Sequence, residues 1–210
     1  MRSIGIFGGT FNPVHFGHLA IAEEIRTKFN LDKIIFVPTH LPPHKQPEDL
    51  AEAGMRTIML FLATVSNPGF EVSTYEVDRG GKSYTIDTVR HFREMFTEKI
   101  QLHFIIGADM LREISTWKNI EELLKLCKFI AVPRPGYDIQ KIFDSYFLAS
   151  SNFNIASELL GNISIEDIPM LDISASNIRK RVREFKSIKY LVPEAVEQFI
   201  HHQHLYLMGG

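Results

Sequence analysis

The residues best suited to chemistry lie near the N-terminus, in the stretch GGTFNPVHFGH from Gly8 to His18. A short apolar run, Ile4 to Phe7, comes before it, and apolar residues at helical spacing follow, which predicts a buried strand, a glycine turn and the start of a helix. Adjacent glycines let the backbone approach a ligand closely, and the N–H groups of a helix N-terminus suit a phosphate. His15 and His18 are three residues apart and would share one helix face beside that phosphate.

Two other interpretations of this stretch are weaker. A metal site would need further ligands, and the first helical turn supplies no third histidine, cysteine or carboxylate aimed the same way. The dinucleotide-binding fingerprint is not met, because Gly5, Gly8 and Gly9 do not have its spacing. We therefore expect a phosphate cradle and no metal held by protein ligands, with a purely structural histidine pair as the remaining alternative.

Composition predicts an ordinary globular enzyme-sized chain. Its 210 residues, 45% hydrophobic and 23% charged, suit one domain spanning 1–210, with a C-terminal helical part at about 174–206. The net charge of -2 argues against sequence-independent nucleic-acid binding. One cysteine, Cys127, excludes an internal disulfide. No apolar run is long enough for a membrane span and no signal-peptide layout is visible, so we expect a cytoplasmic protein without a membrane partner.

Strand and helix patterns alternate along the chain. The pattern predicts further strands at Lys33–Pro38, Phe70–Val77, Leu102–Ile106, Phe129–Val132 and Ile163–Ile168. It predicts helices at about 51–65, from an N-cap at Ser83, around 110–112, at 120–126, from a cap at Ser174 or Ser176, and after Pro193. Tyr137 to Asn162 carries no motif. This alternation predicts an α/β fold, an open, doubly wound and mostly parallel sheet that binds ligands beyond the carboxyl ends of its strands.

Four more segments narrow the interpretation to one family. They are PPHK at 42–45, SYTIDT at 83–88, IIGAD at 105–109 with Trp117 and Lys118, and ISASNIR at 173–179. With the opening stretch, they resemble the bacterial nicotinate-nucleotide adenylyltransferases of the HxGH nucleotidyltransferase superfamily, from Ile4 to Tyr206. The late motif of that family usually has threonine where this chain has Ser176, and a hydroxyl is kept. The family often has glycine where this chain has Phe185.

The resemblance implies a Rossmann-like nucleotidyltransferase fold and transfer of AMP from ATP to nicotinate mononucleotide, with release of pyrophosphate. It implies Mg²⁺ that enters with ATP and keeps most of its waters. It implies catalytic roles for His15, His18, Lys45 and Arg179. The implied ATP site comprises Gly8, Gly9, Thr10, Phe11, His15, His18, Gly107, Asp109, Arg134, Ser174 and Arg179. The implied acceptor site comprises Lys45, Tyr84, Thr85, Asp109 and Trp117.

Other functions stay open at this point. A phosphopantetheine adenylyltransferase also carries HxGH, but it is shorter and lacks the SYT and tryptophan segments; a cytidylyltransferase is disfavoured on the same grounds. A non-catalytic nucleotide-binding regulator would be indicated by the loss of a histidine or of Arg179, and neither is lost. Each proposed side chain also has a structural alternative, such as core packing for Trp117 or helix capping for Asp109. The expected partners are ATP and nicotinate mononucleotide, and a homo-oligomer is left open.

Overall fold

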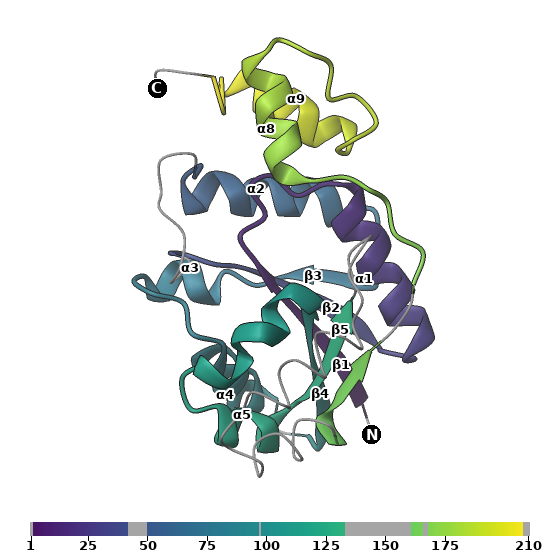
Figure 1. Ribbon diagram of the computed structural model, residues 1–210, viewed down its shortest axis with the longest axis vertical. Coiled ribbons are helices and arrows are strands. Elements are labelled where there is room, and N and C mark those ends of the chain that lie inside the picture. The colour runs from purple at the N-terminus through teal and green to yellow at the C-terminus, as the bar shows by residue number, and fades with distance from the viewer. Residues whose placement is uncertain (1, 42–49, 97, 133–160, 166–167, 208–210) are drawn as a thin grey trace.

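A computed structural model describes residues 2–41, 50–96, 98–132, 161–165 and 168–207. Figure 1 shows a twisted sheet at the centre of the molecule, with α8 and α9 at one end and α4 and α5 at the other. In the part of the chain that the structure describes, no helix has the length and apolar character required to span a bilayer.

Six described strands form one parallel sheet in the order β3-β2-β1-β4-β5-β6. They are β1 (Arg2–Gly9), β2 (Lys33–Pro38), β3 (Phe70–Val72), β4 (Ile100–Gly107), β5 (Lys128–Val132) and β6 (Ile163–Ile165). The predicted doubly wound α/β sheet is confirmed. The strand order reverses between β1 and β4, which is where such sheets bind their ligands, beyond the carboxyl ends of the strands. Here those ends are Gly9 and Gly107.

Helices cover both faces of the sheet. They are α1 (Phe16–Lys28), α2 (Ala53–Thr64), α3 (Tyr75–Arg79), α4 (Thr85–Met95), the 3₁₀ helix η2 (Ala108–Thr116), α5 (Ile120–Leu126), α8 (Ala175–Arg183) and α9 (Glu194–His202). Residues of β1 alternate between two cores: Ile4 and Ile6 pack with α4 and α5, whereas Phe7 packs with α1, α2, α8 and α9. Period-two alternation on a sheet buried on both sides explains why the strands read as continuous apolar runs.

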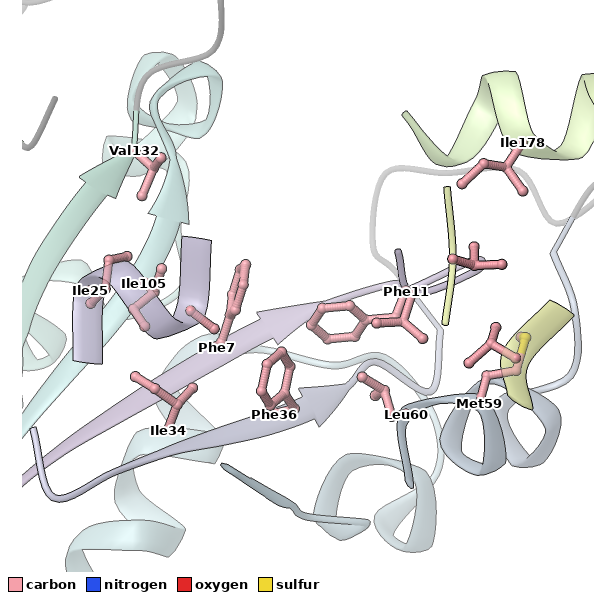
Figure 2. Close-up of a cluster of buried hydrophobic side chains, with 14 of the residues drawn as sticks. Phe7, Phe11, Ile25, Ile34, Phe36, Met59, Leu60, Ile105, Val132 and Ile178 are labelled. Atoms are coloured by element: carbon pink, nitrogen blue, oxygen red, sulfur yellow. The ribbon is translucent and has the colours of Figure 1, made fainter. Parts of the chain in front are cut away.

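An aromatic group joins the second core to the predicted ligand loop. The rings of Phe7, Phe11 and Phe36 lie within 5.6–5.8 Å of one another, centroid to centroid. Figure 2 shows Phe7 and Phe11 beside β1 and Phe36 beside β2, with Met59 of α2 and Ile178 of α8 beyond them. Phe11 belongs to the glycine-led stretch, so burial of its ring ties that loop to the core.

Three sequence predictions are wrong in detail. The strand predicted over Phe70–Val77 ends at Val72, and α3 follows, because Glu76 turns inward and is buried. The cap of α4 is Tyr84, one residue after the predicted Ser83, whose Oγ accepts a hydrogen bond from His40 N at 3.1 Å. The helix around 110–112 is part of a 3₁₀ helix.

The helical C-terminal region packs on the α1–α2 side of the sheet. Ser174 caps α8 by accepting a hydrogen bond from Asn177 N at 3.3 Å, as one of the two predicted caps. Ile178 of α8 and Val196 and Ile200 of α9 are fully buried in the core that contains Phe7. Cys127 is buried, and burial raises the pKa of its thiol to about 12, which is consistent with a packing role.

A buried histidine in β4 should make stability depend on pH. Burial, reinforced by Lys128, lowers the pKa of His103 from 6.5 to about 4. The folded protein keeps this ring neutral, whereas the unfolded chain takes up a proton below pH 6.5, so stability falls as the pH drops from 6.5 towards 4. Between pH 7 and pH 5, the free energy of unfolding should fall by ~2 kcal/mol more in the parent than in His103→Gln, which has no group that titrates at this position. Urea unfolding at both pH values measures this, and equal losses would refute it.

Candidate active site

The candidate site lies at the carboxyl edge of the sheet, where β1 leads into α1. β1 ends at Gly9, and α1 begins at Phe16 with His15 as its N-cap. A Cβ at Gly8 would lie 3.0 Å from the Phe104 ring, and one at Gly9 would lie 3.0 Å from the Phe11 ring. Both glycines are therefore needed for close packing here. The predicted strand and helix start are confirmed, but Gly8 and Gly9 are the last residues of β1 rather than a turn, and the turn follows at Asn12 and Pro13.

The two histidine rings of the motif stack on each other. Their centroids are 3.7 Å apart with an interplanar angle of 27°. The Nδ1 atom of His18 accepts a hydrogen bond from the backbone N–H of His15 at 3.3 Å. A neutral ring that accepts at Nδ1 carries its proton at Nε2, so the backbone presets His18 as an Nε2–H donor.

Aromatic and glycine neighbours hold this pair in place. The His18 ring meets Phe11 edge-on at a centroid distance of 5.1 Å. A Cβ at Gly17 would lie 3.0 Å from Nδ1 and 3.1 Å from Cε1 of the His15 ring. The glycine between the histidines therefore gives the His15 ring the space it occupies, a physical reason for that position of the motif.

Arg179 reaches the same loop from α8. Its Nη1 donates to the backbone carbonyl of Asn12 at 2.9 Å. Its Nε is buried and has no hydrogen-bond partner among the described residues. A buried cationic N–H without a protein acceptor, close to a glycine-led helix start, is suited to an anionic ligand such as phosphate.

A second arginine, which the sequence did not single out, supports the loop from below. Arg56 of α2 is 0% exposed. It donates to the carbonyls of Ala51 at 2.9 Å, Thr10 at 2.8 Å and His40 at 3.0 Å. Burial lowers its pKa to about 10, so it stays cationic at neutral pH. An isolated arginine in a helical pattern looks like a solvated residue, and only the fold reveals that it is buried.

Two of the predicted acceptor residues, Tyr84 and Thr85, lie at the start of α4. Tyr84 is the N-cap and Thr85 the first helical residue, so the N–H groups of this turn have no acceptor within the helix. Trp117 is half-buried, and its ring contacts Phe104 and Phe129 edge-on at 6.4 Å and 6.2 Å. One part of the Trp117 ring therefore packs against the hydrophobic core, and the rest stays accessible. This arrangement is consistent with a packing role and with stacking on a ligand.

Cations surround the one carboxylate in the first turn of α4. Asp87 lies 3.6 Å from Arg79, 3.6 Å from Lys118 and 3.9 Å from Arg90. Lys118 Nζ also lies 4.6 Å from the centroid of the Tyr84 ring. Because three cations face Asp87, its negative charge is balanced locally, and the turn keeps an environment favourable to an anion.

α4 is also supported by a buried carboxyl group that the sequence did not identify. The Thr88 hydroxyl donates to the side chain of Glu76 in α3. Burial raises the pKa of Glu76, although hydrogen bonds from Ser83 and Thr88 partly offset this effect. The polar contacts of Glu76 thus join α3 to the segment that carries Tyr84 and Thr85.

Several predicted residues cannot be placed. Lys45 and Arg134 lie outside the described residues, as does the segment at 137–160, and nothing is described of the Asp109 side chain. Gly107 ends β4 at the switch point, and Thr10 contributes its carbonyl to Arg56. Ser174 starts α8, the helix that carries Arg179. The described part of the site thus joins the β1–α1 loop, α8 and α2, and the contact of Ser83 with His40 joins the start of α4 to the residues after β2.

The chain is similar in sequence to known proteins over almost its whole length. Residues 6–181 match the family described as cytidylyltransferase-like. A "Probable nicotinate-nucleotide adenylyltransferase" of Thermoanaerobacter sp. (strain X514) is 47% identical over 204 residues, covering 97% of this chain and 93% of the relative. A protein of the same name from Moorella thermoacetica (strain ATCC 39073 / JCM 9320) is 47% identical over 203 residues, covering 97% and 91%. The chain belongs to the nicotinate-nucleotide adenylyltransferase family.

Solved structures agree on the fold of this adenylyltransferase family member. Plasmodium falciparum nicotinic acid mononucleotide adenylyltransferase complexed with NaAD has a TM-score of 0.76 at 20% identity, covering 98% of both chains. The same enzyme complexed with APC has a TM-score of 0.73 at 19% identity, again covering 98% of both. The resemblance to the family predicted from five short segments is confirmed, because relatives that align over nearly their full length carry the nicotinate-nucleotide adenylyltransferase name.

Gly17→Ala should damage the site without damaging the fold. The added Cβ would press on the His15 ring, so we expect adenylyl transfer to fall at least tenfold while cooperative melting is kept. Gly54→Ala is the matched control, because a Cβ there meets nothing within 4 Å. In helix α2 that change should stabilise by about 0.5–1 kcal/mol and leave activity unchanged. Steady-state kinetics and melting curves of the two variants decide; an active Gly17→Ala enzyme would contradict the steric argument.

Proposed function

We propose that this adenylyltransferase stabilises the transferred phosphate with His15, His18 and Arg179. The observation that carries the proposal is the stacked histidine pair, with His18 preset as an Nε2–H donor by the His15 backbone. Arg179 reaches the same loop, because its Nη1 donates to the carbonyl of Asn12. The Nε of the same side chain is buried and has no hydrogen-bond partner among the described residues.

The reaction is the transfer of AMP from ATP to nicotinate mononucleotide. A phosphate oxygen of the mononucleotide attacks the α-phosphorus in line, the bond from that phosphorus to the oxygen bridging to the β-phosphate breaks, and pyrophosphate leaves. The product is nicotinate adenine dinucleotide. Such a transfer asks the protein for positioning and electrostatic stabilisation rather than covalent chemistry, and donors aimed at the equatorial oxygens supply this.

Roles for the remaining residues follow the same logic. Backbone N–H groups from Gly8 to Phe11 would donate to the phosphates, and Ser174 would do so at the start of α8. Lys45 and Arg134 would neutralise phosphate charge. Gly107 and Asp109 would hold the ribose at the end of β4. ATP would bind as its Mg²⁺ complex, with most of the metal's waters kept.

The acceptor would bind at the start of α4. The N–H groups of Tyr84 and Thr85 would donate to the carboxylate of nicotinate, and Trp117 would stack on the pyridine ring through the side that its core contacts leave. The balanced charge of Asp87 supports this placement, because an isolated carboxylate in the same turn would repel the acid.

His18→Ala should abolish most activity. Loss of one preorganised donor costs ~10²–10³ in turnover. We expect kcat to fall by that factor while the melting temperature stays within a few degrees of the parent. The matched control is His201→Ala, an exposed histidine in α9 far along the chain from the motif. Pyrophosphate release with saturating MgATP measures both variants, and near-parent turnover of His18→Ala would show that the histidine has no such role.

The acid should be a better acceptor than the amide. A charge-assisted hydrogen bond of ~1.5–3 kcal/mol from the α4 turn to a carboxylate implies at least tenfold preference. Comparing kcat/KM for nicotinate and nicotinamide mononucleotides under one set of conditions measures it. Trp117→Ala should weaken both acceptors together, because stacking does not distinguish the two groups. Equal values, or a preference for the amide, would overturn the proposal that the start of α4 binds the carboxylate.

A further inference from the structure

The C-terminal segment after α9 returns to the motif loop through one tyrosine. The hydroxyl of Tyr206 donates to Oδ1 of Asn12 at 2.9 Å, across 194 residues of sequence. The backbone of Tyr206 has φ +65°, in the left-handed region, which is costly for a residue other than glycine. The surrounding contacts therefore hold this residue in a conformation that its own backbone disfavours.

Asn12 is the point where several supports of the loop meet. Its side chain is almost fully buried, and Oδ1 accepts a second hydrogen bond from Ala51 N at 3.2 Å. Its backbone carbonyl accepts from Nη1 of Arg179. A shift of this residue would therefore move both the loop that leads to His15 and the guanidinium that its carbonyl holds.

The environment of the tyrosine keeps it a donor. Burial raises the pKa of Tyr206, and the nearby charges of Arg179 and Arg56 only partly oppose this. The hydroxyl therefore stays protonated in the working pH range. A second contact supports the loop independently: the N–H of Phe16, the first residue of α1, donates at 3.1 Å to the carbonyl of Leu191, which lies between α8 and α9.

We infer that Tyr206 is a positioning residue for adenylyl transfer: through Asn12 it fixes the carbonyl that orients Arg179. The inference rests on the proposed roles of His18 and Arg179. It makes the segment after α9 part of the catalytic apparatus, although Tyr206 itself does not touch the reacting atoms.

Tyr206→Phe tests this, because it keeps the ring and removes only the hydroxyl. We expect kcat to fall about fivefold to tenfold, with KM for nicotinate mononucleotide within twofold of the parent and cooperative melting retained. Tyr190→Phe makes the same chemical change at a residue that is 80% exposed, and it should match the parent. In an Arg179→Ala background, Tyr206→Phe should cost less than twofold more, because the group that it positions is already absent.

The outcomes separate the possible failures. A Tyr206→Phe enzyme with kcat within twofold of the parent would overturn the inference, whether or not its melting temperature falls. An equal loss in the parent and Arg179→Ala backgrounds would also overturn it, since the effect would then not pass through the arginine. If His18→Ala keeps full activity, the proposed function fails first; if His18→Ala is inactive and Tyr206→Phe is not, only the role of Tyr206 fails.

Discussion

The hydrogen bonds that converge on Asn12 are the constraint on which the site depends. This residue interrupts the glycine-led loop one position after the anchored ring of Phe11, and it is contacted from α8, from the segment before α2 and from the segment after α9. A loop is a poor place for precise geometry unless its backbone is held. Here three distant parts of the chain hold one residue, and His15, the N-cap of α1, follows it three positions later.

Charged side chains near the site are likewise held by several partners each. Arg56 places a full positive charge in the core, where each of its three hydrogen bonds goes to a backbone carbonyl of the loops around the site. Such an arrangement satisfies a buried guanidinium and fixes three points on two connections, β1–α1 and β2–α2. At the start of α4, three cations surround the carboxylate of Asp87.

Local patterns predicted most of the fold. The apolar run from Ile4 to Phe7 predicted a strand, and the helical spacing of apolar residues after the motif predicted a helix. The structure has β1 and α1 in that order, joined by the motif. The alternation over Phe70–Val77 misled, because it continues past Val72, where the strand ends and the chain enters α3 with Glu76 buried against Thr88. A polar residue that is buried for a tertiary partner has no periodic signature.

The same limit explains which parts of the site could be predicted. His15, His18 and Arg179 stand in motifs, so their types and spacing indicated chemistry. Arg56 and Tyr206 stand alone in sequence, and what they do is set by partners up to 194 residues away. Long-range contacts of single residues follow from the fold and cannot be read from a window of sequence.

The central claim is that the backbone presets His18 and Arg179 as donors to the phosphates of ATP. The most direct test is nitrogen-15 NMR of the histidine rings and arginine Nε–H groups, with and without the Mg²⁺ complex of a non-hydrolysable ATP analogue. The account predicts that neutral His18 carries its proton on Nε2 in the free enzyme, and that the His18 Nε2–H and Arg179 Nε–H signals both shift when the analogue binds. A proton on Nδ1 of His18, or signals that do not move at saturating analogue, would contradict it.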